Sequence, residues 1–406
     1  GSPACQQGGL MSDAKTPGDD SLIAQLAGKI PAQSAGVVIV DLQRLADNWR
    51  ALQSLVAPAK CAATVKADAY GLGVAEVVPA LTAAGADTFF VATLDEAVGV
   101  RSLAPDATVF ALNGIFPGTT AAVIESGVVP VLSGLPEVDE WGAAAPSRRH
   151  PLPCALQVDT GLNRLGLSAP EIQKLAANMQ LLDRLDVKLV MSHLACADEP
   201  NNPKNAQQLS IFHRLQPLLP SAPLSLAASD GLMLGPDYHF DLVRPGYALY
   251  GGQALSDQTA PIKPVVEAYA RVLQVRTLAP GQTIGYSASF VAERMMRVAV
   301  IAAGYADGYL RHLSTANTEQ GGHVAFAGKL APVAGRVSMD LITVDVTDLE
   351  DTPIERGDWA QIIGPDISIE DIGRASGTIG YEVLTRLSPR FTRVYTPAST
   401  RPQPEA

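Results

Sequence analysis

Lys66 is the residue whose surroundings most favour covalent chemistry. It lies near the end of an apolar run, CAATVKA (61–67), in which a protonated amine would be costly to bury. Burial lowers the pKa of a lysine, and a neutral amine can form a Schiff base with a carbonyl compound. A lone lysine of this kind more often extends to the surface as an ordinary cation. A functional interpretation is favoured here because other polar residues also follow apolar runs: Asp159, Thr160, Arg164, His193, Ser229 and Arg244.

The pattern around these residues predicts an α/β barrel. After a first β-rich run from Val37 and a helix from about Leu42, short β-rich runs alternate with helical patterns. Eight alternating units favour a (β/α)8 TIM-like barrel, with a doubly wound sheet as the alternative. Residues just past each strand of a barrel form its active-site rim. The expected strands are 61–67, 88–93, 108–114, 128–133, 154–160, 187–193, 223–229 and 241–246, and the helical segments include 72–83, 94–103, 117–126, 169–180 and 204–217.

The pattern changes after about Gly251. From Val265 to Tyr395 the β-rich runs continue with turns such as PGQ, ERGD and GPD, while helical patterns are scarce, so we expect a C-terminal all-β domain. The residues before Met11, GSPACQQGGL, are interpreted as a cloning remnant. The expected division is a remnant and flexible leader (1–34), the barrel (35–262), the β domain (263–398) and a loose tail (399–406).

Composition and charge exclude several functions. Thirty Lys+Arg against 41 Asp+Glu give a net charge of −11 without a basic stripe, which argues against a nucleic-acid partner. Apolar stretches end before the roughly 20 residues of a membrane span. Four cysteines without a CxxC pattern and no secretion signal favour a reducing, cytoplasmic location. The six histidines lack metal-site spacing, so no metal is expected. GLG at 71–73 lacks the third glycine of a dinucleotide-binding loop, and there is no P-loop.

The motif VKADAYGLG (65–73) resembles the cofactor-lysine motif of the alanine racemases, fold-type III enzymes that use pyridoxal 5′-phosphate (PLP). The resemblance extends from about Gly36 to Arg393 and implies an eight-stranded α/β barrel followed by a β domain. It also implies a homodimer in which the partner's β domain completes each active site. Further motifs occur in the family's order: VDTGLNRLGL (158–167), SHLACAD (192–198), LAASDG (226–231), DLVRPGYALYG (241–251), GYADGYLR (304–311), GRVSMD (335–340) and TIGYEV (378–383).

The resemblance assigns a cofactor role to several residues. Lys66 is expected to hold PLP covalently, His193 to lie against its ring and Arg244 to donate to its pyridine nitrogen. Because arginine does not lose its proton near neutrality, that nitrogen stays unprotonated, which favours racemisation over transamination. The phosphate is expected to bind Tyr70, Ser229, the backbone at Gly246 and Tyr247, and Tyr381.

Racemisation requires an acid/base group on each face of the α-carbon. The resemblance implies Lys66 on one face and Tyr305, from the second subunit, on the other. Arg164 is expected to pair with the substrate carboxylate and the backbone N–H of Met339 to contact it, with Asp340 in support.

The sequence departs from the family pattern at two places. Some members carry a carbamylated lysine where this chain has Gln157, so another group must position Arg164. The family often has Asn-Ser where this chain has Ala228-Ser229, so one hydrogen bond near the phosphate is expected to be missing. Neither change removes a catalytic group.

The leading hypothesis is an alanine racemase that supplies D-alanine for peptidoglycan. A broad-specificity amino-acid racemase of the same fold is the nearest alternative. A fold-type III decarboxylase is disfavoured by Arg244, since that reaction needs a protonated ring nitrogen. A non-catalytic PLP carrier is disfavoured by the second domain and Tyr305, and a PLP-independent aldolase by the phosphate-site motifs.

Overall fold

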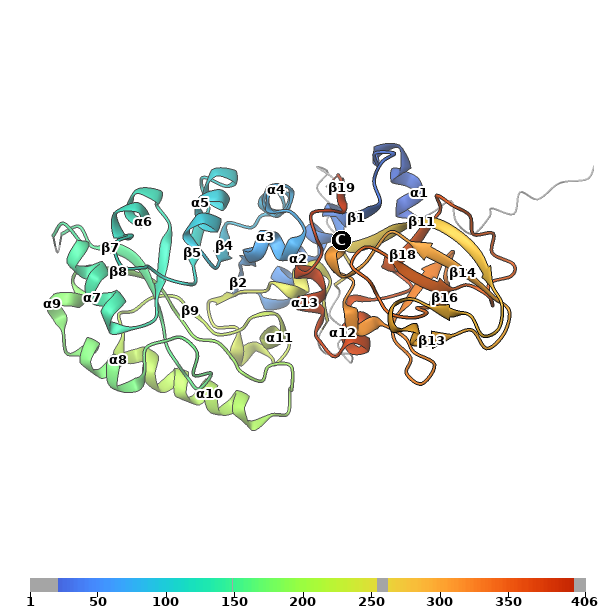
Figure 1. The fold of residues 1–406 in the computed structure, drawn as a ribbon. Coiled ribbons are helices and arrows are strands. Elements are labelled where there is room, and N and C mark those ends of the chain that lie inside the picture. The colour runs from blue at the N-terminus through green and yellow to red at the C-terminus, as the bar shows by residue number, and fades with distance from the viewer. Residues whose placement is uncertain (1–20, 148, 254–261, 398–406) are drawn as a thin grey trace, which may run out of the picture.

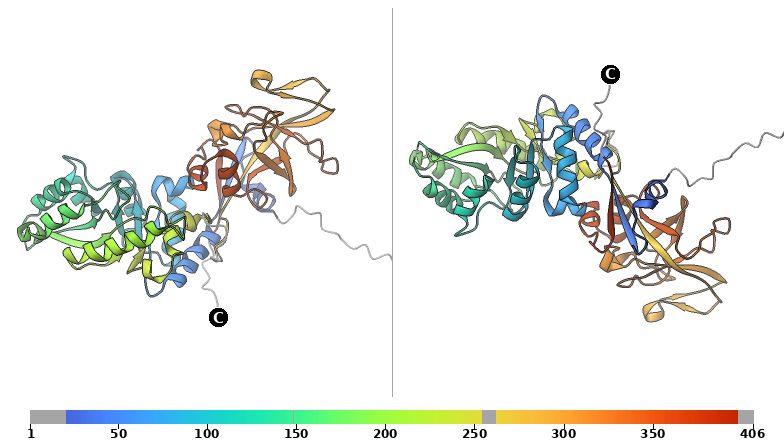
Figure 2. Two further views of the ribbon diagram at one scale, coloured as in Figure 1. Left: turned by 90° about the horizontal axis from the view of Figure 1, so that it is seen from below. Right: turned by 90° about the horizontal axis from the view of Figure 1, so that it is seen from above.

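The chain folds into two domains that lie side by side, an α/β barrel and a sheet-rich C-terminal domain (Figure 1). The structure is a computed structural model and describes residues 21–147, 149–253 and 262–397. The expected cloning remnant and the tail 399–406 lie outside these residues. The turned views in Figure 2 show that the two domains are inclined to one another.

The barrel is a closed ring of parallel strands. In the described residues, a seven-stranded parallel sheet runs in the order β3-β4-β5-β6-β7-β8-β9, and β10 pairs with β2. Hydrogen bonds from Ala62 N to Val243 O and from Arg244 N to Ala227 O, both 2.9 Å, close the ring through β10. The predicted barrel is therefore confirmed. Its strands are β2 (Lys60–Cys61), β3 (Ala63–Thr64), β4 (Thr88–Val91), β5 (Thr108–Ala111), β6 (Val129–Leu132), β7 (Leu152–Gln157), β8 (Leu185–Met191), β9 (Leu224–Ser225) and β10 (Leu242–Val243).

Helices cover the outside of the barrel. Helix α2 (Leu42–Val56) shows why: its residues Leu45, Trp49, Leu52 and Val56 recur every three or four positions and are buried. The expected helix at 169–180 is divided in two, because Asn178 begins a new short helix by accepting a hydrogen bond from Leu181 N. The other elements of this layer are α4 (Val74–Ala84), α5 (Leu94–Leu103), α6 (Thr120–Ser126), α7 (Leu135–Ala144), α8 (Ala169–Ala176), α9 (Met179–Leu182) and α10 (Pro203–Leu215). Two short segments, α3 (Lys66–Gly71) and α11 (Ser229–Leu232), instead lie at the C-terminal ends of the barrel strands.

The C-terminal domain is built on a mixed sheet with the order β16-β15-β18-β11-β1-β19, to which β14 and β17 add through β11. Two helices, α12 (Ile369–Ser376) and α13 (Gly380–Thr385), belong to this domain, so it is sheet-rich without being purely β. Its strands are β11 (Val266–Leu278), β12 (Thr283–Ile284), β13 (Phe290–Val291), β14 (Met296–Ile301), β15 (His323–Phe326), β16 (Lys329–Pro332), β17 (Ile342–Asp345), β18 (Trp359–Ile363) and β19 (Thr392–Thr396), with β1 (Gly36–Asp41) from the N-terminus.

The strand β1 pairs antiparallel with β11 and parallel with β19. The expected boundary at residue 35 assigned it to the barrel, but its hydrogen bonds are made in the sheet of the second domain. All six of its residues are buried: residues 36–40 are glycine or apolar, and Asp41 caps helix α2 by accepting from Arg44 N. The short helix α1 (Leu22–Leu26) precedes it. The chain thus contributes β1 to the second domain, then forms the barrel with β2–β10, and then completes the second domain with β11–β19.

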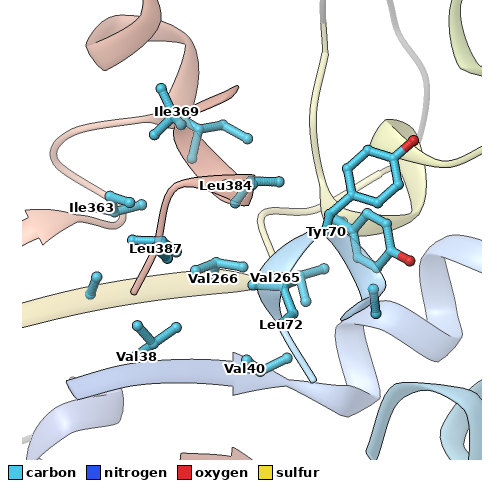
Figure 3. Close-up of a cluster of buried hydrophobic side chains, with 14 of the residues drawn as sticks. Val38, Val40, Tyr70, Leu72, Val265, Val266, Ile363, Ile369, Leu384 and Leu387 are labelled. Carbon is cyan, nitrogen blue, oxygen red and sulfur yellow. The ribbon is translucent and has the colours of Figure 1, made fainter. Parts of the chain in front are cut away.

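The two domains share one hydrophobic core near the barrel mouth (Figure 3). Val38 and Val40 of β1 belong to the same buried cluster as Tyr70 and Leu72, which follow the first barrel strand. Leu384 of α13 adds to this cluster from the second domain. This shared packing fixes α13 against α3, and it therefore holds elements of the second domain at the rim of the barrel.

Candidate active site

Lys66 is followed by a turn of left-handed backbone. Residues 67–70 all have φ between 53 and 57°. Each residue other than glycine in this conformation costs about 1–2 kcal/mol, so outside contacts must hold the turn. Those contacts come from both domains: Ala67 N to Glu96 Oε1 (2.8 Å), Val74 N to Asp68 Oδ1 (2.7 Å), Arg393 Nη2 to Gly71 O (2.9 Å) and Tyr395 OH to Leu72 O (2.8 Å).

A cavity of about 710 Å³ opens at the C-terminal ends of the barrel strands. Residues of the second domain, from α13 and the residue before it, also form part of its wall. The structure thus brings together most of the residues that the sequence assigned to cofactor and substrate: Lys66, Tyr70, Arg164, His193, Ser229, Arg244, Gly246 and Tyr381.

Arg244 lines the cavity and is only 4% exposed. Its guanidinium donates to Ser225 Oγ, to Ser192 O (2.7 Å) and to His193 Nδ1 (3.4 Å). Burial lowers the pKa of Arg244 to about 9, so it remains a cation at neutral pH. All these partners are neutral, and in the described part of the chain no carboxylate forms a salt bridge with Arg244. The site therefore offers a positive hydrogen-bond donor to a neutral acceptor.

His193 is held in its neutral form. Burial, followed by the positive charges of Arg244, Arg164 and Lys66, lowers the pKa of His193 to about 3. Its Nδ1 therefore accepts the hydrogen bond from Arg244. A neutral imidazole can pack against a flat ring without adding a further positive charge to the cavity.

Ser229, Gly246 and Tyr70 form a second part of the cavity wall, the cradle. Ser229 Oγ accepts hydrogen bonds from Gly246 N and Ala248 N, both 3.0 Å. A Cβ atom at residue 246 would lie 2.2 Å from the hydroxyl of Tyr70, so only glycine allows this close approach. Small oxygen-rich anions are well suited to such a cluster of N–H and hydroxyl groups.

Two stacked tyrosines adjoin the cradle, of which Tyr381 lines the cavity and Tyr247 is buried behind it. The rings of Tyr247 and Tyr381 lie 4.0 Å apart between centroids, at an angle of 20°. Tyr247 donates to Glu370 Oε1 (2.8 Å) and Tyr381 donates to Asp230 Oδ2 (3.3 Å). Burial raises the pKa of both hydroxyls, so both remain protonated donors.

Arg164 projects from the loop after β7, and Lys66 lies within reach of its charge. Burial first, and then the positive charges of Arg164 and Arg244, lower the pKa of Lys66, while Glu96 opposes them. Gln157 is buried and donates from Nε2 to Leu165 O at 3.3 Å. In the described residues Arg164 forms no salt bridge, including none to Asp159, whose carboxylate accepts from the Gly161 and Asn163 amides. Arg164 therefore remains available to an anion.

Tyr305 and Met339 lie away from this cavity. They do not line it, and they are 44% and 53% exposed on the C-terminal domain. Asp340 accepts from Arg390 Nη1 at 2.7 Å in the same region. The structure thus separates these three predicted residues from Lys66 within one chain.

Comparison with known proteins decides the family. The sequence model of the alanine racemase N-terminal domain matches residues 40–254, and that of the C-terminal domain matches residues 265–395. This chain belongs to the alanine racemase family. The biosynthetic alanine racemase of Agrobacterium fabrum is 46% identical over 88% of this chain and 92% of its own. The alanine racemase of Brucella ovis is 46% identical over 89% and 94%.

Solved alanine racemase structures share the fold. The enzyme of Bartonella henselae, which has covalently bound pyridoxal phosphate, aligns with a TM-score of 0.85 at 39% identity, over 89% of this chain and 100% of that one. The biosynthetic alanine racemase of Pseudomonas aeruginosa aligns with a TM-score of 0.82 at 35% identity, over 90% and 100%. Similarity to the alanine racemases thus covers both domains.

Sequence reasoning missed two residues of this alanine racemase site. Glu96 joins the Lys66 turn to the β4–α5 loop, and Asp230 holds Tyr381. The sequence does contain one indication that Glu96 is structurally important, because Thr93 and Glu96 have the spacing of a helix capping box and form one. Its bond to Ala67 joins elements 29 positions apart, which no local pattern reveals.

The described residues contain neither a cluster of metal ligands nor a membrane-spanning helix. No group of three or more His, Cys, Asp or Glu residues could hold a metal ion there. No helix in that part of the chain is long and apolar enough to cross a membrane.

Proposed function

We propose that this protein is a PLP-dependent alanine racemase that interconverts L- and D-alanine. The observation that carries the proposal is the cavity itself, in which Lys66, with its lowered pKa, shares the walls with Arg244, Ser229 and Gly246. A lysine amine, a cationic donor and an anion cradle in one cavity fit the aldehyde, ring nitrogen and phosphate of PLP. Family membership supports the same function.

The residues fit PLP because the cradle lacks a side chain where a phosphate must approach the backbone. Gly246 leaves the space next to Tyr70 that a Cβ atom would fill. Ser229, Tyr70 and the amides near Tyr247 would hold the phosphate, with Tyr381 beside them. Lys66 would hold the cofactor covalently. When bound, PLP delocalises the electron pair that remains after the α-proton of the amino acid leaves.

The protein groups around the cofactor bind, orient and transfer protons. Lys66 would remove or return the α-proton on one face of the substrate. Arg164, which has no salt-bridge partner among the described residues, would bind the substrate carboxylate with two parallel hydrogen bonds. Arg244 donates without losing its proton, and neutral His193 orients it.

The second base would come from another subunit. Tyr305 and Met339 are exposed and lie outside the cavity of their own chain. A homodimer in which the surface that carries them covers the partner's barrel mouth would place Tyr305 opposite Lys66 and Met339 near the substrate carboxylate. This arrangement would also cover the side chains of Tyr305 and Met339, which are exposed in the single chain. We further propose that the enzyme acts in the cytoplasm and supplies D-alanine for peptidoglycan.

The test is chiral chromatography of L-alanine, L-serine and L-lysine after incubation with the purified protein and PLP. D-alanine formed alone, or far faster than the other products, supports an alanine racemase. Comparable conversion of lysine would replace that proposal with a broad-specificity racemase. The absence of any D-product in the presence of bound PLP would contradict racemase function altogether.

A further inference from the structure

Arg390 of the C-terminal domain pairs with two carboxylates close to Tyr305 and Met339 in the sequence. Its Nε donates to Asp307 Oδ1 (2.7 Å) and its Nη2 to Asp307 Oδ2 (2.8 Å), a two-pronged pair. Its third nitrogen, Nη1, donates to Asp340 Oδ1 (2.7 Å). Asp307 is 2% exposed, whereas the Arg390 side chain is half exposed. One guanidinium therefore pairs with a buried carboxylate and an exposed one.

The two carboxylates belong to the two turns that carry Tyr305 and Met339. The short helix η6 (Tyr305–Asp307) contains Tyr305 and Asp307, and Met339 immediately precedes Asp340. Asp307 Oδ2 also accepts a hydrogen bond from Gly304 N (2.9 Å), the residue before Tyr305. Arg390 thus connects both turns by their acidic side chains.

The backbones of the two turns are joined as well. Tyr305 N donates to Ser338 O (3.0 Å) and Ala306 N donates to Met339 O (3.1 Å). A Cβ atom on Gly304 would lie 2.2 Å from Met339 O, so the two backbones are in close contact. The carbonyl groups of 338 and 339 are oriented toward the Tyr305 turn, and a shift of either turn must move the other.

We propose that Arg390, acting through Asp307 and Asp340, is a positioning residue that fixes Tyr305 and Met339 for the active site of the partner subunit. The inference rests on the proposed function, in which these two residues act in the partner's cavity. The geometry favours this role because Arg390 restrains both turns while its own chain's cavity lies elsewhere. A multidentate guanidinium gives directional restraint that a single ammonium group does not.

The variants to compare are Arg390→Gln, Arg390→Lys and a matched control, Arg294→Gln. Arg294 has similar exposure and also pairs with two carboxylates of this domain, Asp348 and Asp345, but contacts neither the cavity nor the two turns. Arg390→Gln should lower kcat for alanine racemisation by about 10- to 100-fold, the usual effect of displacing a reacting group by about 1 Å. Arg390→Lys should recover part of the loss, and Arg294→Gln should keep wild-type activity.

Isotope exchange separates positioning from a general structural role. In the proposed two-base reaction, Tyr305 removes the α-proton of L-alanine and Lys66 removes that of D-alanine. In heavy water, Arg390→Gln should therefore lose exchange of the α-hydrogen of L-alanine more steeply than that of D-alanine. The visible absorption of bound PLP and the sedimentation of the dimer should stay unchanged. Equal losses for both enantiomers, or loss of the dimer or of bound PLP, would overturn the inference.

A mixed dimer tests whether Arg390 acts across the interface. A Lys66→Ala chain and an Arg390→Gln chain, co-expressed with different tags, form one site that has Lys66 from one chain and Arg390 from the other. That dimer should have about half of wild-type activity, because one of its two sites is intact. If it is no more active than the Arg390→Gln homodimer while the wild type racemises alanine, the inference is wrong and the proposed function stands. If the wild type itself forms no D-alanine, the proposed function fails.

Discussion

At the scale of single residues, Lys66 shows how the cavity sets the charge of its central group. Burial and the positive charges of Arg164 and Arg244 lower the pKa of Lys66, and Glu96 alone acts in the opposite direction. The guanidinium groups therefore favour the neutral amine that attacks a carbonyl. Glu96 also accepts from Ala67 N, so the same carboxylate fixes the backbone next to the lysine.

Lys66→Ala should abolish both racemisation and the visible absorption of bound PLP, because no other lysine lines the cavity in the described part of the chain. The absorption spectrum after reconstitution and gel filtration measures the effect. Lys60→Ala is the matched control, since Lys60 lies in β2, six residues before Lys66, and lines a different pocket. Visible absorption retained in Lys66→Ala would show that another group holds the cofactor.

The uptake of PLP by the apoprotein should rise with pH, because the neutral form of Lys66 reacts. Since the pKa of Lys66 is lowered, the midpoint should lie below the ordinary value of 10.5. Arg164→Gln removes a charge that lowers this pKa and should move the midpoint up, whereas Glu96→Gln should move it down. Arg164→Lys keeps the charge and serves as control. Stopped-flow absorbance across pH measures the midpoints. Shifts in the same direction for Arg164→Gln and Glu96→Gln would show that these two charges do not set the pKa of Lys66.

Tyr305→Phe should keep the absorption of bound PLP but lower racemisation by about 10²–10⁴-fold, the usual contribution of a general base. Exchange of the α-hydrogen of D-alanine with heavy water should persist, since Lys66 is unchanged, while exchange of L-alanine should be lost. Mass spectrometry of each enantiomer measures this. Tyr309→Phe is the control, because Tyr309 is buried and its hydroxyl donates to His323 O away from the cavity. Racemisation at the wild-type rate in Tyr305→Phe would exclude it as the second base.

At the scale of elements, two backbone segments decide the shape of the cavity. The left-handed turn 67–70 follows Lys66 and is held by residues from α5 and β19. The segment at Gly246 meets Tyr70 from the other side, and Ser229 at the start of α11 fixes its amides. Distant elements therefore cooperate to build one anion cradle.

Gly246→Ala should weaken cofactor retention, because its Cβ would lie 2.2 Å from the Tyr70 hydroxyl. Overpacking of this kind costs about 1–3 kcal/mol, which corresponds to roughly 5- to 150-fold in PLP affinity. Gly99→Ala in α5 is the control, since no atom lies within 4 Å of a Cβ there. PLP titration of the apoproteins measures both affinities. Equal affinities for the two variants would show that the contact at Gly246 is not needed.

At the scale of the whole molecule, the sequence predicted the barrel and the residues on its rim, because strand patterns and motifs are local. It did not place β1, whose uniformly apolar run is compatible with either domain and whose partners, β11 and β19, lie more than 200 residues away. Glu96 and Arg390 were also missed, since their roles depend on contacts between distant segments. The separation of Tyr305 from the cavity of its own chain agrees with the family resemblance, which assigned Tyr305 to the second subunit, whereas no local pattern in the sequence indicates it.

The most direct measurement of the shared active site is the activity of a mixed dimer of Lys66→Ala and Tyr305→Phe chains. Each homodimer lacks one base in both sites and should be inactive. In the mixed dimer, one site combines the Lys66 of one chain with the Tyr305 of the other and should give about half of wild-type racemisation. A mixed dimer as inactive as the two homodimers would contradict an active site built from two subunits.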